Sequence, residues 1–208
     1  MSSDAPAAAR PTGGPASARR RQADRTAATK AGLADAAIEV LVERGWAALT
    51  VAEVCKRAGV TRGAFHHHYD SLPALMADAL RRLYAVMVDG ARPPVTDLVS
   101  LVDATWSAIG NPRFKAVIEA WLAMANDPGL RAEVGPVVAE FATLVRPDTT
   151  APSLLVSAER RQFYALAREA LLGLALGRAT NGGTPLGHER SVLDRLRAEA
   201  TAIDGRAR

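Results

Sequence analysis

Hydrophobic residues recur at helical spacing from residue 26 to residue 89, and small or turn-forming residues interrupt them three times. In the first segment the acidic residues lie off the apolar face, which is the pattern of an amphipathic helix packed on a core. Gly45 follows this segment, in the position where a glycine commonly ends a helix. The pattern therefore predicts a helix over residues 26–44. Its apolar face is made by Leu33, Ala37, Val40 and Leu41.

Two short segments come next, and each begins with a threonine that can cap a helix. Thr50 has Glu53 three residues later, which is the spacing of a capping box, and Gly59 marks the end about two turns on. Thr61 opens the second segment, which runs to about Tyr69. The sequence therefore predicts two short helices joined by a tight glycine turn, which is the arrangement of a helix-turn-helix.

A fourth helix is predicted to begin after Asp70 or Ser71, either of which can cap it, and to run to about Asp89. Pro73 would lie in its first turn, where proline is tolerated. Aromatic residues make up only 5% of the chain, and runs of β-branched residues are scarce. The whole pattern predicts an all-α fold. Beyond residue 95 the predicted helices are separated by breaks at 110–112, 127–129, 146–156 and 180–187.

The helix predicted over residues 157–179 is apolar nearly all round, so it should be buried on more than one side. One side can face its own domain, and the other needs a partner. With the helix predicted over 188–203 it favours a four-helix dimer interface, two helices from each chain. Packing wholly within one chain is the alternative. The interface residues predicted are Phe163, Ala167, Ala170, Leu174, Val192 and Leu196.

Most of the formal net charge of +4 comes from the N-terminal residues. Residues 1–25 carry five arginines against two aspartates, and the rest of this segment is mainly Pro, Gly, Ser and Ala. Nothing in it could be buried in a core, so it is predicted to be a disordered basic arm. Two interpretations stay open: the arm is a solvated leader, or it contacts a polyanion.

Several classes of protein are disfavoured by the sequence. The single cysteine cannot form an internal disulfide, and no apolar stretch approaches the roughly 20 residues of a membrane span. The N-terminal residues lack the apolar segment of a signal peptide. The sequence also shows no carboxylate pair, phosphate-binding glycine loop or metal-ligand spacing. We therefore expect a cytoplasmic protein with no membrane attachment, no enzymatic activity and no cofactor.

The stretch AAIEVLVERGWAALTVAEVCKRAGVTRGAFHHHYDSLPAL, residues 36–75, resembles the N-terminal domain of TetR-family transcriptional regulators. The shared features are a helix ending in Gly-aromatic, a Thr-Val-led second helix, an Ala-Gly-Val-Thr turn and a His-aromatic ending. The resemblance implies a helix-turn-helix DNA-binding domain over 26–90 and a helical ligand-binding and dimerisation domain over 91–208. It also implies a homodimeric repressor, released from a palindromic double-stranded operator by a small apolar or amphipathic effector.

The predicted recognition helix begins at the turn, where the first residues of such a helix meet base edges. Arg62 stands there, and arginine can bond a guanine through two hydrogen bonds. A solvated surface arginine is the alternative. The family usually has tyrosine at the position of His66 and lysine at that of Leu72, so phosphate binding should rely more on the arm. The DNA-contact residues predicted are Arg25, Thr50, Thr61, Arg62, Gly63, His66, His67 and Tyr69.

Residues 66–68 are three consecutive histidines. Neighbouring side chains on a helix point about 100° apart, so these three cannot converge on one metal ion. On a recognition helix, His66 and His67 would instead project towards phosphates and base edges, and His68 would be structural near the helix end. Phe65 and Tyr69 would dock the helix on the core. The alternative is three solvated or core-capping histidines without a role in DNA binding.

Aromatic and methionine side chains gather on the predicted helices of the C-terminal region and on the helix that connects it to the N-terminal one. They could line a small-molecule pocket, and the alternative is that each belongs to the core. A constitutive DNA-binding protein without a functional pocket is the corresponding alternative function. The residues predicted to line the pocket are Tyr84, Met87, Trp106, Phe114, Trp121, Met124 and Phe141.

Overall fold

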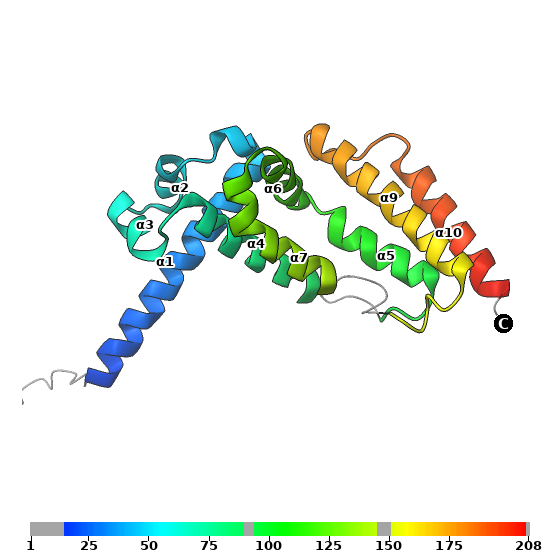
Figure 1. Ribbon diagram of the computed structural model, residues 1–208, viewed down its shortest axis with the longest axis horizontal. Coiled ribbons are helices and arrows are strands. Elements are labelled where there is room, and N and C mark those ends of the chain that lie inside the picture. The colour runs from blue at the N-terminus through cyan, green and yellow to red at the C-terminus, as the bar shows by residue number, and fades with distance from the viewer. Residues whose placement is uncertain (1–14, 90–93, 145–150, 207–208) are drawn as a thin grey trace, which may run out of the picture.

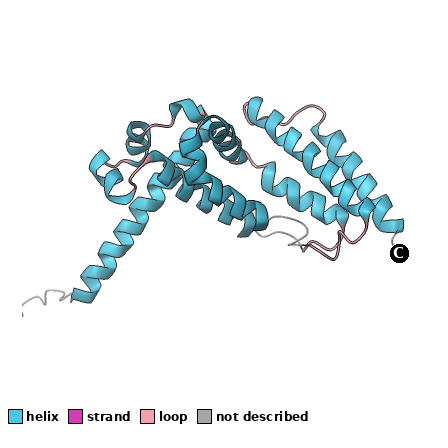
Figure 2. Cartoon of the chain, in the orientation of Figure 1, coloured by secondary structure: helices cyan, strands magenta, loops and turns pink. Residues whose placement is uncertain are grey.

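The computed structural model describes residues 15–89, 94–144 and 151–206 of the 208-residue chain (Figure 1). Every regular element among these residues is helical, as Figure 2 shows, so the prediction of an all-α fold is confirmed. A 3₁₀ turn, Trp46–Ala48, precedes the second helix. The helices are α1 (Pro15–Arg44), α2 (Val51–Ala58), α3 (Arg62–His68), α4 (Leu72–Asp89), α5 (Leu98–Ile109), α6 (Phe114–Asn126), α7 (Pro128–Leu144), α9 (Ala158–Thr180) and α10 (Glu189–Arg206).

Helix α1 begins eleven residues earlier than the sequence predicted, at Pro15 rather than at residue 26. The prediction of disorder was therefore wrong for residues 15–25. It rested on the lack of apolar residues, but Ala, Arg and Gln have high intrinsic helix propensity and extend a helix without a core. A proline is also tolerated as the first helical residue. The extension projects away from the rest of the molecule (Figure 1). Residues 1–14 of the predicted arm lie outside the described residues.

Side-chain caps fix the boundaries of the short helices where the sequence predicted them. The hydroxyl oxygens of Thr50 and Thr61 accept hydrogen bonds from the backbone N–H groups of Glu53 and Ala64, each at 3.1 Å. Ser71, rather than Asp70, caps α4 by accepting from the N–H group three residues later at 3.2 Å. Each such cap stabilises its helix by about 1 kcal/mol.

The main hydrophobic core is shared by α1–α4, α6 and α7, so it runs across the predicted domain boundary at residue 90. Phe65 of α3 and Phe114 of α6 are both buried in it. A second cluster joins α5, α9 and α10, with Leu171 at its centre. Trp106 and Ile109, at the end of α5, pack against both clusters and so connect them.

Helix α6 is joined to the end of α1 by two long-range hydrogen bonds. The Lys115 ammonium donates to the Val42 carbonyl at 2.7 Å, and the Trp46 backbone N–H donates to Glu119 Oε2 at 2.9 Å. The chain turns between these groups at Gly45, whose φ of 74° strains any residue with a side chain. A cation near the last carbonyls of a helix is also favoured by the helix dipole. The N-terminal helices are thus fixed directly to α6.

A buried ion pair holds together the three helices of the second cluster at one end. Arg178 of α9 donates to both carboxylate oxygens of Glu189 in α10, at 2.6 and 3.1 Å. Its remaining nitrogen donates to the carbonyl of Gly110, which ends α5. The guanidinium also lies over the Trp106 ring, 5.3 Å from its centroid. One side chain therefore links α9 and α10 to the α5–α6 turn.

No helix in the described parts of the chain combines the length and the apolar character needed to cross a bilayer.

Candidate nucleic-acid interface

The turn between α2 and α3 has the geometry of a helix-turn-helix. Gly59 adopts left-handed backbone angles, φ 67° and ψ 30°, and ends α2. The next N–H group, of Val60, donates back to the Cys55 carbonyl at 3.0 Å. A glycine occupies this conformation without the steric cost that a Cβ atom brings. Because the turn is tight, only three residues separate the end of α2 from the start of α3.

Two aromatic side chains anchor α3 to the core. Phe65 is fully buried, and its ring centroid lies 5.9 Å from that of Tyr69. The Tyr69 hydroxyl donates to Asp78 Oδ2 of α4 at 2.6 Å and lies 3.3 Å from the Lys30 carbonyl of α1. Tyr69 is only 4% exposed, so its predicted role as a DNA contact was wrong and its role as an anchor holds.

Sequence reasoning missed the polar group that holds this anchor, because its members lie on three different helices. Burial and the hydrogen bond to Asp78 raise the pKa of Tyr69, which therefore stays protonated and donates. Burial tends to raise the pKa of Asp78, but the bond from Tyr69 and the charges of Lys30 and Arg82 hold it below the usual value. Asp78 is therefore a carboxylate that fixes the end of α3 against α1 and α4.

The opposite side of α3 is exposed and carries four of the eight residues predicted to meet DNA. Arg62, Gly63, His66 and His67 are all solvent-exposed, and Arg62 forms no salt bridge with any described residue. The structure thus presents a cation and two imidazole rings on one short helix. The exposed caps Thr50 and Thr61 lie at the N-terminal ends of α2 and α3.

Gly63 is not required by the packing of the chain itself. A Cβ atom built there would approach only the Thr61 hydroxyl oxygen, at an ordinary 3.7 Å. A glycine inside a helix costs about 1 kcal/mol relative to alanine. Packing within the described residues therefore gives no reason for a glycine at this position of α3.

The three histidines make two separate ring contacts. His66 meets the edge of Phe65, with centroids 5.2 Å apart, and the rings of His67 and His68 meet edge to face at 5.1 Å. In the part of the chain that the structure describes, no three His, Cys, Asp or Glu side chains are placed to hold a metal ion. His68 is partly covered, whereas the other two are exposed.

Most of the residues predicted to line a ligand pocket lie in the main core. The rings of Tyr84 and Phe141 are stacked 3.8 Å apart, at an interplanar angle of 4°. Phe114 and Trp121 meet edge to face at 5.6 Å. These residues therefore gather around α4, α6 and α7, and Trp106 stands apart at the junction with α5. Met87 and Met124 are buried in the same core.

Most of the dimer-interface residues predicted from the sequence are buried within the chain itself. Phe163, Ala167, Leu174 and Leu196 are at most 9% exposed, because they form the second cluster within the chain. A side chain buried there has no surface left for a partner. Ala170 and Val192 are half-buried at its edge.

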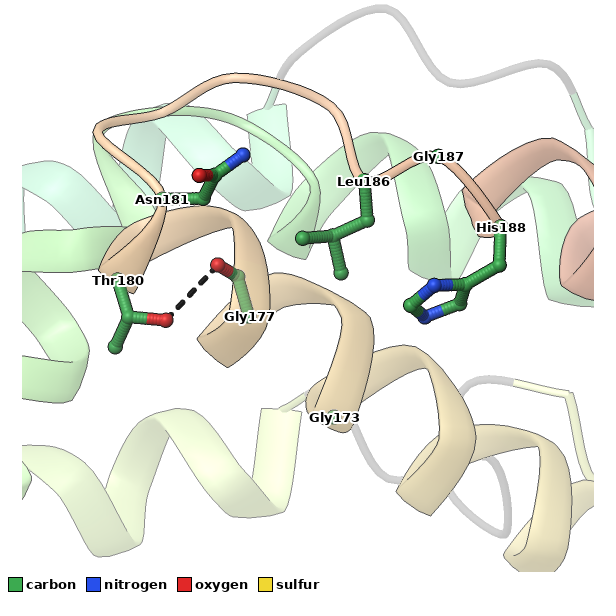
Figure 3. A pocket seen from close by; sticks show the side chains of 7 residues that line it. All are labelled: Gly173, Gly177, Thr180, Asn181, Leu186, Gly187 and His188. Carbon is green, nitrogen blue, oxygen red and sulfur yellow. Dashed lines mark hydrogen bonds between the residues drawn. The ribbon is translucent and has the colours of Figure 1, made fainter.

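Another face of α9 leaves large apolar side chains in solvent. Leu166 is 69% exposed and Leu176 is 47% exposed. A groove of about 550 Å³ opens at the C-terminal end of α9 (Figure 3). Of the two glycines that α9 contributes to it, Gly173 has nothing within 4 Å of a built Cβ, whereas a Cβ on Gly177 would lie 2.7 Å from Leu186 Cδ1. The groove is lined by Gly173, Gly177, Thr180, Asn181, Leu186, Gly187 and His188.

The chain is similar to known regulators. The family model "Bacterial regulatory proteins, tetR family" matches residues 33–79. The HTH-type transcriptional regulator CymR of Pseudomonas putida is 31% identical over 120 residues, which cover 54% of this chain and only 59% of CymR. The match therefore spans less than two thirds of that relative.

Solved structures resemble the fold over a longer range. A transcriptional regulator from Rhodococcus sp. Rha1 has a TM-score of 0.65 at 22% identity, covering 82% of this chain and 95% of that one. The multidrug binding protein EbrR, solved with imidazole, has a TM-score of 0.54 at 27% identity, covering 80% and 93%. The all-helical architecture is thus shared well beyond the helix-turn-helix.

Proposed function

The chain belongs to the TetR family of bacterial regulatory proteins, a family of regulators rather than enzymes, and from that premise we propose that it is a ligand-responsive transcriptional repressor. The observation that carries this proposal is α3, a short helix fixed to the core by Phe65 and Tyr69. Arg62, His66 and His67 are exposed on the side of α3 that faces away from the core. Since it would act on chromosomal DNA, we place the protein in the cytoplasm.

We propose that α3 enters the major groove of double-stranded DNA. A recognition helix presents its N-terminal residues to base edges while neighbouring caps and N–H groups bind phosphates. Arg62 suits guanine, and Gly63 allows the helix backbone close to the bases. Thr50, Thr61 and His66 can donate to phosphates, and Arg25 extends the contact along α1.

We further propose that two copies bind a palindromic operator as a homodimer. One chain presents one recognition helix, whereas a two-fold dimer presents two, about 34–36 Å apart on adjacent turns of DNA. The exposed face of α9 supports this, because Leu166 and Leu176 would be covered by a second α9. Gly173, which lines the groove at the end of α9, would allow the two helices to approach closely.

A small-molecule effector would act through α4. This helix is bonded to the end of α3 through Asp78 and Tyr69, and it stacks on α7 through Tyr84 and Phe141. A molecule that enters the core between α4 and α7 would shift α4 and, with it, α3. Because the spacing of the two recognition helices must match the half-sites, a small shift lowers operator affinity.

Specific binding to a palindromic duplex is the first expected result. In an electrophoretic shift with promoter fragments, including the DNA upstream of the protein's own gene, we expect one complex that contains two copies of the chain. Scrambling either half-site should weaken it strongly, since each half-site holds one α3. Equal affinity for the intact and the scrambled duplex would contradict both the recognition helix and the two-fold arrangement.

Arg62→Ala is expected to weaken operator binding by about 1–3 kcal/mol and to relax the preference at one base pair in each half-site. The side chain is exposed and unpaired among the described residues, so its removal should leave the melting temperature unchanged. The measurement is the affinity for the operator and for each single-base variant of it. A loss of equal size on operator and random DNA would show instead that Arg62 contacts a phosphate.

A further inference from the structure

Two polar atoms in the main core are buried without a hydrogen-bond partner among the described residues. They are the hydroxyl oxygen of Tyr84 in α4 and the indole nitrogen of Trp121 in α6. Tyr84 as a whole is only 4% exposed. Leaving a buried donor unbonded costs about 1–3 kcal/mol, so native cores rarely keep two of them close together.

Both groups are donors, and this decides what could satisfy them. An indole N–H can only donate, and burial raises the pKa of Tyr84 to about 12, so the phenol keeps its proton at neutral pH. The indole N–H lies near the phenol oxygen and tends to lower that pKa, although the two atoms do not meet hydrogen-bond geometry. Even an aligned bond would leave the phenol proton without an acceptor. The site therefore lacks one accepting atom.

The surroundings of these donors are apolar and aromatic. The Tyr84 ring is stacked on Phe141 of α7, and Trp121 meets the edge of Phe114. Among the described residues, the only buried charged side chains are Arg160 and Glu189, which belong to α9 and α10. A charged molecule would find no counter-ion here and would lose its hydration, so the core favours a neutral one.

Helix α7 is interrupted by a proline, and this affects how a ligand could reach the Tyr84 ring. Pro136 lies inside the helix, where it cannot donate to the carbonyl four residues earlier. The following turns carry Phe141, whose ring covers one face of Tyr84. Displacing the C-terminal part of α7 therefore breaks fewer hydrogen bonds than bending an uninterrupted helix, and it uncovers the Tyr84 ring.

We propose that this core site binds a neutral aromatic molecule that carries a hydrogen-bond-accepting oxygen, such as an aryl ketone, ester or amide. Its ring takes the place of Phe141 on the face of Tyr84. Its oxygen accepts hydrogen bonds from the Tyr84 hydroxyl and the Trp121 indole. This inference rests on the proposed ligand-responsive function and names the class of effector.

Calorimetric titrations of the full chain with three molecules of similar shape separate the contributions of the aromatic ring, the accepting oxygen and a negative charge to binding. Acetophenone has the ring and the oxygen, ethylbenzene has the ring alone, and benzoate adds a negative charge. We expect saturable binding of acetophenone, with ethylbenzene and benzoate each at least about tenfold weaker, since each hydrogen bond or buried charge is worth 1 kcal/mol or more. Equal affinities for acetophenone and ethylbenzene would overturn the proposal, as would the absence of saturable acetophenone binding.

Conservative variants test the two donors. Tyr84→Phe should raise or preserve the melting temperature, because it removes an unbonded hydroxyl, and should weaken acetophenone binding about tenfold without affecting ethylbenzene. Trp121→Phe should also weaken acetophenone preferentially. Tyr164→Phe is the matched control, since that hydroxyl is 2.9 Å from Thr105 Oγ1 in the second cluster. It should lower the melting temperature and leave acetophenone binding unchanged.

The result of the acetophenone titrations does not depend on whether the protein binds DNA. If the acetophenone series fails while the protein binds its operator, the effector class is wrong and the regulator remains. If the series succeeds without any specific operator, the proposed function is wrong and the core site remains. Unchanged acetophenone affinity in both Tyr84→Phe and Trp121→Phe would reject the two donors as the recognition element.

Discussion

Replacing both exposed leucines of α9, as Leu166→Glu/Leu176→Glu, is expected to dissociate the proposed dimer and to weaken specific operator binding strongly. Covering a leucine side chain stabilises an interface by about 1.5–3 kcal/mol, and two-fold symmetry makes every loss occur twice. The glutamates would also place like charges from two subunits against each other. Together these effects should raise the dimer dissociation constant by at least about 100-fold.

The measurement is the molar mass in solution across a concentration series, followed by titration of the operator. A monomer holds only one half-site, and loss of the second contact should lower operator affinity by about two orders of magnitude or more. Leu122→Glu is the matched control, because Leu122 is a leucine of a different helix, α6, and is 59% exposed. A double variant that remains dimeric would place the interface elsewhere.

The α9 face shows where sequence reasoning reached its limit. The helix is apolar nearly all round, from which the sequence predicted that more than one of its sides is covered. Periodicity, however, gives the same pattern for a side packed in the chain's own core and for a side packed on a partner. Phe163 and Leu174 were assigned to a partner, but they pack on α5 and α10, whose position no local pattern reveals. The exposure of Leu166 became evident only in three dimensions.

The helix-turn-helix, in contrast, could be predicted almost to the residue. Its boundaries depend on contacts within three or four residues, namely the threonine caps and the left-handed glycine at the turn. Of the contacts that anchor α3 to the core, only some were predicted. Phe65 follows from the apolar face of α3, whereas the partner of the Tyr69 hydroxyl, Asp78, lies on another helix and carries no local signal. The same limit applies to the Tyr84 and Trp121 donors, since an unbonded atom is a property of the packed core.

The extended α1 changes what is expected of the N-terminal arginines. As a flexible arm, Arg19, Arg20 and Arg21 could all follow the DNA backbone. On a helix, consecutive side chains point about 100° apart, so a duplex on one side meets at most two of the three. All three are exposed, and only Arg21 makes a polar contact there, a 3.4 Å bond to Ser17. The helix therefore places the three arginines away from the core, but it limits how many of them can contact DNA at the same time.

Arg19→Gln/Arg20→Gln/Arg21→Gln is therefore expected to flatten the salt dependence of operator binding by about one to two units in the plot of log K against log salt. Each phosphate neutralised adds roughly 0.9 to that slope, and glutamine keeps the helix while removing the charge. Affinity for specific and random DNA should fall together, because phosphates carry no sequence. Lysine at the same three positions is the matched control and should keep the slope. Operator titrations between low and moderate salt give the result, and parallel lines for the glutamine variant and the native chain would show that the extension of α1 does not touch DNA.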